Sequence, residues 1–401
     1  MASTNGITVR SARAEERPEL VQLMDMGFGM RGGPADIEFG PQVFPTERAL
    51  VAVDGDRLVG HVNDRVMTVT VPGPRTVEAS GVTGVAVAPT HRRRGILRAL
   101  YTALHERIEA EGLPLTIFTV SEGGIYGRFG YGPSIQEIDL SIRGRTAEFR
   151  TTTPDPGGVR VASLTEAEQA LPEIYDRWRR LTPGAQVRPE ARWRQRIFAE
   201  SVQNEDGAPQ FFLIHPDGYA ILRRSWHDYK NTATIREMRT VTPEAHIALW
   251  RVLLSMDLVH DIKASTYDGD PLPFLVTDPR LIEVVGRHDT LWTRLMDVPA
   301  ALTARTYQRD LDVVLAVDDP FRGAGGTFAL RVRDGIAECA PTDRGPDLEL
   351  GIDVLGSLYF GVYRARVYAA ANRIQAKDAA VLRAFDEAFT AEREAEVGWF
   401  F

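Results

Sequence analysis

The chain has 401 residues, of which 44% are apolar and 25% are charged, and these proportions are typical of a globular protein with two or three domains. Its one cysteine, Cys339, excludes an intrachain disulfide, and its eight scattered histidines lack metal-ligand spacing, so we expect no bound metal. The formal net charge of −8 argues against nucleic acid as a partner and is compatible with a cationic substrate.

We expect neither a signal peptide nor a membrane span. The N-terminal segment lacks an apolar core, and no stretch approaches the roughly 18 apolar residues that cross a bilayer. This pattern predicts a cytoplasmic protein. Export by a route without a signal peptide stays open, because it would leave no trace in the sequence.

Two stretches of the chain follow the same order of elements. Residues 49–62 read as strand, Asp-Gly turn and strand, and a further strand then leads into a helix that begins at Gly95. Residues 210–224 again read as strand, Pro-Asp-Gly turn and strand, followed by a strand over 231–241 and a helix over 242–256. The match predicts two copies of one α+β unit.

After about residue 291 the pattern changes to short strands over 311–319, 326–335 and 336–342, followed by helices within 353–363 and 376–389. This order predicts a third, smaller α+β domain. Proline and glycine near residues 153–158 mark a boundary. We therefore predict domains over residues 1–155, 156–290 and 291–401.

An Arg/Gly-rich turn, residues 92–95, joins an apolar strand to the helix of the first copy. Leu97, Leu100, Leu104 and Ile108 give that helix an apolar stripe, and Gly112 is a natural stop. A helix N-terminus offers free N–H groups and a positive dipole end, and arginines suit a diphosphate.

A solvated basic turn is the alternative interpretation of residues 92–95. However, the spacing Arg-x-x-Gly-x after a strand resembles the acetyl-CoA pyrophosphate motif of GCN5-related N-acetyltransferases (GNATs), which usually have Gly or Ala where Leu97 stands. The second copy has neither glycine nor arginine at this turn. We therefore expect the second copy to be scaffold or substrate wall.

The segment SEGGIYGRFGYG, residues 121–132, places Tyr126 among five glycines. In the GNAT fold a tyrosine near the thioester sulfur follows the cofactor helix, and we predict Ser121 as N-cap of a short helix that ends at Gly130. A coenzyme A thiol has a pKa near ~8.5 and tyrosine one near ~10, so complete proton transfer is uphill by roughly 2 kcal/mol. Tyr126 is therefore a candidate general acid that donates a hydrogen bond, with the glycines keeping the approach clear. The alternative is a core tyrosine packed beside Phe129 and Tyr131.

The chain ends in EVGWFF, and an apolar end of this kind is expected to dock onto the protein. Docking would carry the terminal carboxylate of Phe401 inside. With an ordinary pKa of about 3.5 it is a weak base toward an ammonium near ~10.4, so it needs desolvation or a relaying water. A hydrophobic plug with an incidental carboxylate is the alternative.

Together, VAVAPTHRRRG, SEGGIYGRFGYGP, HPDGYA, LWR, DPLP, DVLGSLYFG and AAANR resemble the enhanced intracellular survival (Eis) family of N-acetyltransferases, from about residue 50 to 401. The resemblance implies a mixed α/β, α+β-class fold: two tandem GNAT-type domains, the second without cofactor, then a sterol-carrier-protein-like α+β domain. It also implies a homohexamer that acetylates aminoglycoside amines and lysines, with Tyr126 as general acid and Phe401 as general base. The acetyl-CoA contacts that it implies are Val85, Ala86, Val87, Arg92, Arg93, Arg94, Gly95, Ile96, Leu97, Arg98, Ser121 and Glu122.

Departures from the family pattern concentrate in the substrate pocket. Residues 24–44 align poorly, and Gly84 stands where the family can place an aromatic side chain. A glycine there predicts a wider pocket for bulky or varied amines. The candidate substrate residues are Asp25, Phe28, Asp36, Glu38, Phe39 and Gly84.

Three functions follow from these patterns. We favour an acetyl-CoA-dependent enzyme that acetylates primary amines of aminoglycoside or polyamine-like substrates, with protein lysine acetylation as the alternative. A lipid-binding module in the third domain is the candidate from a different class, and it would need an apolar tunnel. The motifs LGSLYFGVY and VGWFF can instead form part of the core and a docked tail, and we prefer this interpretation to a lipid tunnel.

Overall fold

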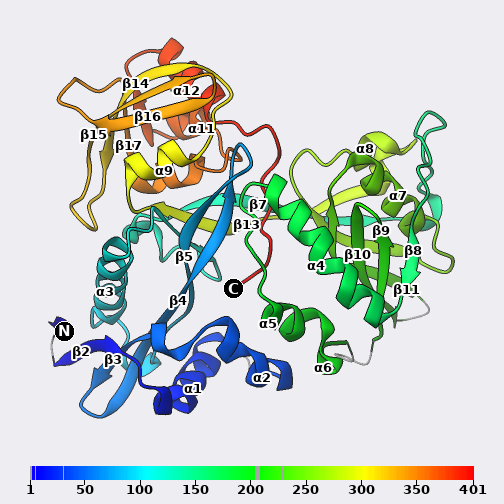
Figure 1. The fold of residues 1–401 in the computed structure, drawn as a ribbon, viewed down its shortest axis with the longest axis horizontal. Helices are drawn as coiled ribbons and strands as arrows, with labels where there is room; N and C mark the ends of the chain where they lie inside the picture. The colour runs from blue at the N-terminus through cyan, green and yellow to red at the C-terminus, as the bar shows by residue number, and fades with distance from the viewer. Residues whose placement is uncertain (1, 5, 30, 204–207, 228–229) are drawn as a thin grey trace. The chain divides into compact units, whose positions relative to one another are not determined.

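The computed structural model describes residues 2–4, 6–29, 31–203, 208–227 and 230–401 (Figure 1). The chain forms two compact units. Unit 1 is made of Met1–Ile135, Pro183–Arg192 and Thr290–Phe401, and unit 2 of Gln136–Thr182 and Trp193–Asp289. The domain bounds expected from the sequence stay a prediction. Within the described ranges, no helix is both long and apolar enough to cross a membrane.

The first part of the chain holds the elements that form the N-terminal portion of unit 1. They are β1 (Ala2–Thr4), β2 (Ile7–Ser11), α1 (Arg17–Phe28), α2 (Pro34–Val43), β3 (Leu50–Asp54), β4 (Arg57–Val71), β5 (Arg75–Val87), α3 (Ile96–Ala110), β6 (Leu115–Thr119) and β7 (Gly132–Ile142). Short 3-10 turns cover Ala14–Glu16, Thr46–Arg48, Pro89–His91 and Gly127–Phe129, and another, Gly144–Thr146, belongs to unit 2. Strand β7 and the later strand β13 contribute residues to both units.

Seven strands of unit 1 are paired in the order β1-β2-β3-β4-β5-β6-β13. All neighbours are antiparallel except β5 and β6, which run parallel and are joined through α3. The long β4–β5 hairpin is the blue ribbon in Figure 1. Ile96, Leu100, Leu104 and Ile108 of α3 are buried against the sheet at intervals of four residues. The apolar stripe therefore begins at Ile96, and Leu97 is only partly buried.

The middle of the chain holds the elements of unit 2. They are β8 (Arg160–Ala162), α4 (Leu164–Leu181), a π-helical turn (Arg194–Phe198), α6 (Glu200–Gln203), β9 (Gln210–His215), β10 (Gly218–His227), β11 (Lys230–Thr240), α7 (Pro243–Leu254), β12 (Asp261–Thr266), α8 (Leu272–Leu275), a 3-10 turn (Pro279–Leu281) and β13 (Ile282–Leu295). The short helix α5 (Glu190–Trp193) belongs mostly to unit 1, which includes Pro183–Arg192.

Unit 2 repeats the element order of unit 1. The strands β9, β10 and β11 are successive antiparallel neighbours, as β3, β4 and β5 are, and α7 then leads to β12, which pairs parallel with β11. Its core gathers Leu249 and Trp250 of α7 with apolar residues of the strands. The repeat predicted from the sequence is confirmed.

The C-terminal part of unit 1 is a separate five-stranded sheet with helices packed against it, in yellow to red in Figure 1. The strand order is β16-β15-β14-β17-β18, with only β14 and β17 parallel. Its elements are α9 (Val298–Ala304), β14 (Leu311–Asp318), β15 (Gly326–Arg333), β16 (Ile336–Pro341), β17 (Leu348–Gly351), α10 (Ile352–Leu358), α11 (Ala365–Ala370), β18 (Ile374–Ala376) and α12 (Ala379–Ala388). The predicted strands and helices of this third α+β region are confirmed.

Candidate active site

A cavity of about 890 Å³ lies in unit 1 where β5 and β6 part. The two parallel strands pair only over Ala79–Gly81 and Leu115–Ile117, so β5 continues to Val87 without β6 beside it. Ligands of open α/β sheets bind at such carboxyl ends of strands. The described lining residues are Gly27, Phe28, Val85, Ala86, Val87, His91, Arg92, Arg93, Gly95, Ile96, Leu97, Arg98, Ser121, Glu122, Ile125, Tyr126, Arg128 and Phe129.

A β-bulge shapes the β5 side of this cavity. His61 pairs with Ala86 but Asn63 pairs with Thr83, so β5 carries one extra residue at this point. Gly84 lies in the bulge with φ of +63°, a conformation that glycine adopts at little cost. Its carbonyl accepts a 2.5 Å hydrogen bond from Nδ1 of His61, a buried histidine whose pKa is lowered by that burial.

Gly84 does not belong to the described cavity lining. A Cβ built on it would come within 2.8 Å of the His61 ring and 3.0 Å of the Met24 sulfur. Backbone conformation and close packing therefore account for this glycine. Its effect on the width of a substrate pocket, expected from the sequence, stays a prediction.

The turn before α3 provides a concave, positively charged wall. Arg93 and Gly95 have φ values of +63° and +80°, and Arg92 and Arg93 line the cavity. Within the described part of the chain, no side chain caps the N-terminus of α3, because its N-cap is Gly95. The first N–H groups of the helix therefore stay available to an anion.

The matching helix of unit 2 differs at this position. Thr242, the N-cap of α7, accepts a hydrogen bond from the N–H of Ala245 at 3.3 Å, and Pro243 removes another N–H group. The helix end is therefore satisfied by its own chain. This is the physical reason why the second copy offers less to a phosphate.

Arg94 differs from the two arginines before it. Its Nη1 lies 3.0 Å from Oδ2 of Asp54, and His91 Nε2 lies 3.2 Å from the same oxygen. The hydrogen bond from Arg94 lowers the pKa of Asp54. Arg94 is outside the described lining, and its contact with Asp54 ties the turn to the end of β3.

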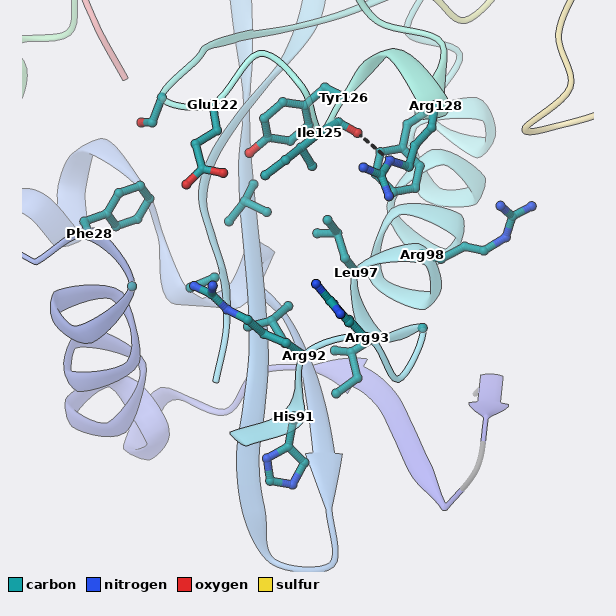
Figure 2. Close-up of a pocket in the computed structure, with 18 residues that line it drawn as sticks. Phe28, His91, Arg92, Arg93, Leu97, Arg98, Glu122, Ile125, Tyr126 and Arg128 are labelled. Atoms are coloured by element: carbon teal, nitrogen blue, oxygen red, sulfur yellow. Dashed lines mark hydrogen bonds between the residues drawn. The ribbon is translucent and has the colours of Figure 1, made fainter. Parts of the chain in front are cut away.

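Tyr126 lies on the opposite side of the cavity from Arg92 and Arg93, next to Glu122 (Figure 2). It is half-buried, and its ring packs 4.4 Å from that of Phe118 between centroids. Burial raises the pKa of Tyr126 to about 12, and the Glu122 carboxylate adds to the shift. The hydroxyl therefore keeps its proton at neutral pH.

The local structure around Tyr126 is a turn that ends in a single 3-10 turn, Gly127–Phe129, closed by Gly130 with φ of +82°. Ser121 lies in a bend several residues earlier, so its predicted role as N-cap of this helix is wrong. Successive turns over residues 123–126 separate Ser121 from the 3-10 helix, which is only three residues long. Ser121 instead lines the cavity.

The glycines around Tyr126 serve different ends. A Cβ on Gly124 or Gly127 would meet nothing within 4 Å, which leaves that side open. A Cβ on Gly130 would lie 1.7 Å from Nη1 of Arg294, and one on Gly132 would lie 2.0 Å from the carbonyl of Asp353. These two glycines therefore permit close packing by the C-terminal part of the chain.

The C-terminal tail is docked in unit 1. The Phe401 N–H donates to Thr119 Oγ1 at 3.2 Å, and the Thr119 hydroxyl donates to an oxygen of the terminal carboxylate of Phe401. The tail before it is held by the segment Pro183–Arg192. There the Gln186 side chain accepts the Trp399 N–H at 3.3 Å, and the Arg192 guanidinium lies 4.9 Å from a Trp399 ring centroid. Phe401 is thus anchored at the end of β6, although it is outside the described lining.

The predicted substrate residues are spread over α1 and α2. Phe28 lines the cavity, together with its neighbour Gly27. The side chain of Asp36 accepts the Gly33 N–H at 3.1 Å and so caps α2. Asp25, Asp36, Glu38 and Phe39 are not part of the described lining, and position 30 lies outside the described residues.

Five lining residues were not identified from the sequence: Gly27, His91, Ile125, Arg128 and Phe129. His91 directly precedes the arginine turn, and three of the others flank Tyr126. Closeness in sequence to these two motifs was therefore the signal that could have identified them. Arg128 is held by its own turn, because its Nε donates to the Ile125 carbonyl at 3.0 Å (Figure 2). Across the described residues, no group of three or more His, Cys, Asp or Glu side chains is placed to hold a metal.

Comparison with known proteins identifies all three regions. Residues 8–134 and 184–305 each match a family described as acetyltransferase (GNAT) domain, and residues 298–395 match the sterol carrier protein domain. The chain is 41% identical to N-acetyltransferase Eis of Mycobacterium tuberculosis (strain ATCC 25177 / H37Ra), covering 96% of this chain and 97% of that protein.

Two further relatives agree with this match. An uncharacterized N-acetyltransferase of Streptomyces griseus is 32% identical over 96% of this chain and 98% of its own length. The crystal structure of Eis1 from Mycobacterium abscessus superposes with a TM-score of 0.89 at 30% identity, covering 98% of this chain and all of that one. The predicted fold class and family resemblance are confirmed. With a GNAT domain around the cavity, a second one after it and a sterol-carrier domain at the end, this chain belongs to the Eis family of N-acetyltransferases.

Proposed function

We propose that this enzyme transfers the acetyl group of acetyl-CoA directly to primary amines of aminoglycoside or polyamine-like substrates. The observation that carries the proposal is one cavity with an uncapped helix N-terminus and two arginines on one side and a protonated tyrosine on the other. Diphosphate recognition and leaving-group protonation are the two tasks that thioester aminolysis requires.

The residues present fit acetyl-CoA. A cavity of about 890 Å³ is within the usual size for a cofactor site. The first N–H groups of α3, with Arg92 and Arg93, would hold the diphosphate, and the edge of β5 over Val85–Val87 would lie along the pantetheine arm. Gly95 leaves open space, since a Cβ there would meet nothing within 4 Å. We assign Ile96, Leu97, Arg98, Ser121 and Glu122 to the remaining acetyl-CoA contacts.

Tyr126 acts as the general acid in this proposal. Its pKa of about 12 keeps the hydroxyl protonated while it donates a hydrogen bond to the sulfur. That hydrogen bond stabilises negative charge as it develops on the leaving thiolate, without requiring complete transfer of the proton. The proposal takes transfer to be direct and uses no cysteine nucleophile: none of the described residues that line the cavity is a cysteine, and burial raises the pKa of Cys339 to about 12.

We assign the base to the terminal carboxylate of Phe401. The double contact with Thr119 holds the end of the chain two residues before Ser121, which lines the cavity. The Phe401 ring packs in the same apolar cluster as Tyr126 and Ile125. A partly desolvated carboxylate there would accept the amine proton directly or through a water.

The test is an assay of free thiol release from acetyl-CoA with a multi-amine aminoglycoside, comparing the natural chain with Tyr126→Ala. Cys339 makes a low background thiol because it is partly buried with a raised pKa. Release by the natural chain that is lost in the variant supports both transfer and the acid. Acetyl-CoA binding without release would move the proposal to another amine, and failure to bind acetyl-CoA would overturn it.

Acetylation of protein lysines is the second candidate. The rim residues Phe28, Ser121 and Glu122 are exposed, so a lysine of another protein can reach the cavity. A lipid-binding role in the C-terminal region has less support. A cavity of about 420 Å³ there is lined partly by Asp318, Glu349 and Arg373, charged groups that do not suit an apolar chain.

The family relationship also leads us to propose a homohexamer. Sedimentation of the purified protein tests this directly, and a monomer at micromolar concentration would contradict it. The hexamer is not needed for the acid and diphosphate roles assigned above, because those residues come from one chain.

A further inference from the structure

The C-terminal region reaches the back of the acetyl-transfer cavity through residues 319–322. The Phe321 ring packs edge-on against Phe129 at 5.0 Å and against His105 of α3 at 5.3 Å. The guanidinium of Arg98, a cavity residue, lies 5.1 Å from the Phe321 ring centroid. All these residues belong to unit 1. A loop of the sterol-carrier region therefore supports two walls of the cavity.

A buried ion pair beside this loop contacts the tyrosine turn directly. Arg294 of β13 is fully buried, and its Nη2 lies 2.5 Å from Oδ2 of Asp319, which is 5% exposed. Nη1 of the same guanidinium donates to the Phe129 carbonyl at 2.9 Å and to Asp319 Oδ1 at 3.2 Å. One arginine thus joins the C-terminal loop to the last residue of the 3-10 turn after Tyr126.

Backbone hydrogen bonds within the turn connect Phe129 to Tyr126. The N–H of Phe129 donates to the Tyr126 carbonyl at 2.9 Å, and the N–H of Tyr131 donates to it at 3.4 Å. The guanidinium fills the space beside Gly130, where a Cβ would clash with it. Any shift of the guanidinium would therefore displace the peptide that sets the position of Tyr126.

We propose that Arg294 and Asp319 are positioning residues for Tyr126, so that the sterol-carrier region completes the acid side of the active site. The inference rests on the proposed role of Tyr126 as general acid. A buried ion pair is often no more stabilising than apolar residues of similar size. Its value here is geometric, since the planar guanidinium holds a carboxylate and a carbonyl at once.

The test uses the paired replacement Arg294→Met with Asp319→Leu, which removes both charges together and leaves neither buried alone. We expect kcat to fall by roughly 10- to 100-fold, because displacement of a reacting group by about 1 Å costs this much. The KM for acetyl-CoA should change by less than about threefold, because the diphosphate wall is untouched. Arg294→Lys keeps the charge but loses the planar fork, so its kcat should lie between that of the natural chain and that of the paired replacement.

The decisive readout is the same replacement in a Tyr126→Phe background. If the pair acts through Tyr126, the further loss of kcat there should shrink to about twofold or less. A merely structural role would lower kcat by the same factor in both backgrounds, and that result overturns the inference. Equal kcat for Arg294→Met/Asp319→Leu and the natural chain would overturn it as well.

Arg364→Met with Asp386→Leu is the matched control. This pair lies in the same C-terminal region, with Asp386 5% exposed and 2.7 Å from Arg364, and neither residue lines the described cavity. It should leave kcat unchanged at a similar cost in thermal stability. If the natural chain releases no thiol, the proposed function has failed. If Tyr126→Phe has the same kcat as the natural chain, the proposed role of Tyr126 has failed. Both results are distinct from a failure of the inference on Arg294 and Asp319.

Discussion

Tyr126 is the side chain on which the proposed acetyl transfer would most depend. Its raised pKa, about 12, comes mainly from burial, and its hydroxyl faces Glu122 and the cavity (Figure 2). Tyr126→Phe keeps the ring packing against Phe118 but removes the proton, so we expect kcat to fall by roughly 10²- to 10³-fold. Initial rates of thiol release measure this. An unchanged kcat at saturating acetyl-CoA would remove Tyr126 from the reaction.

The terminal carboxylate of Phe401 permits an equally local test. Adding one glycine after Phe401 keeps the aromatic ring and its packing but moves the charge away from Thr119. We expect kcat to fall by about 10²-fold, the lower end for loss of a general base. Phe401→Leu keeps the carboxylate in place, so its kcat should fall much less. If the order of the two variants is reversed, the apolar plug is the better explanation of the tail.

At the scale of an element, the start of α3 predicts different roles for neighbouring arginines. Arg93 lines the cavity, whereas Arg94 is paired with Asp54 at 3.0 Å. Arg93→Ala should raise the KM for acetyl-CoA by about 10-fold, because it removes a charge-assisted contact to phosphate. Arg94→Ala is the matched control and should raise it by about threefold at most. Equal effects would mean that the whole basic turn acts only through its summed charge.

The hairpin β4–β5 contains a buried carboxylate that the sequence did not single out. Asp64 is fully buried, and its oxygens accept from Arg48 at 2.9 Å, Arg107 at 2.6 Å and Ser80 at 2.7 Å. Asp64→Ala removes the carboxylate that Arg48 and Arg107 share, although Arg48 keeps Glu111 at 2.9 Å, and should lower the free energy of unfolding by about 3 kcal/mol. Urea unfolding measures it. Asp56 is exposed, so Asp56→Asn should change the free energy of unfolding by less than about 0.5 kcal/mol. Similar losses of stability in Asp64→Ala and Asp56→Asn would contradict the prediction.

Local spacing explains which parts of the site were predictable from the sequence. The arginine turn, the tyrosine segment and the repeated strand-helix order depend on neighbouring residues, and all three patterns were visible in the sequence. The helix start at Ser121 was wrong because the glycines there form successive turns and not a helix. Gly84 and Gly130 have causes that lie far along the chain, at His61 and Arg294. Contacts of that kind have no local signature, so no spacing rule could have revealed them.

For the whole molecule, buried phenols make stability depend on pH on the alkaline side. Tyr101, Tyr131, Tyr307 and Tyr359 are nearly or fully buried, and burial raises the pKa of each above the ordinary value. In the unfolded chain these phenols ionise near pH ~10. Their contribution to stability is therefore fully present below about pH 10 and is lost as pH rises toward the folded pKa values, by roughly 1.4 kcal/mol per pH unit for each tyrosine.

Thermal unfolding followed from about pH 8 to pH 11 tests this dependence. The melting temperature should fall steeply only above about pH 10, and phenolate absorbance of these four tyrosines should appear together with unfolding. Complete ionisation of all tyrosines in a chain that still has its native circular dichroism would contradict the burial argument.

Unit 1 has a consequence for how the protein is made. Its strands come from residues at both ends of the chain, and Thr119 meets Phe401 across 282 positions of sequence. At the usual 5–20 residues per second, a ribosome finishes Ile135 roughly eight to thirty seconds before it starts on Thr290. During that interval the nascent N-terminal strands lack β13, the loop at Phe321 and the docked tail. The proposed acetyl-transfer site is thus completed only late in synthesis, and its apolar surfaces are prone to aggregation until the last segment arrives.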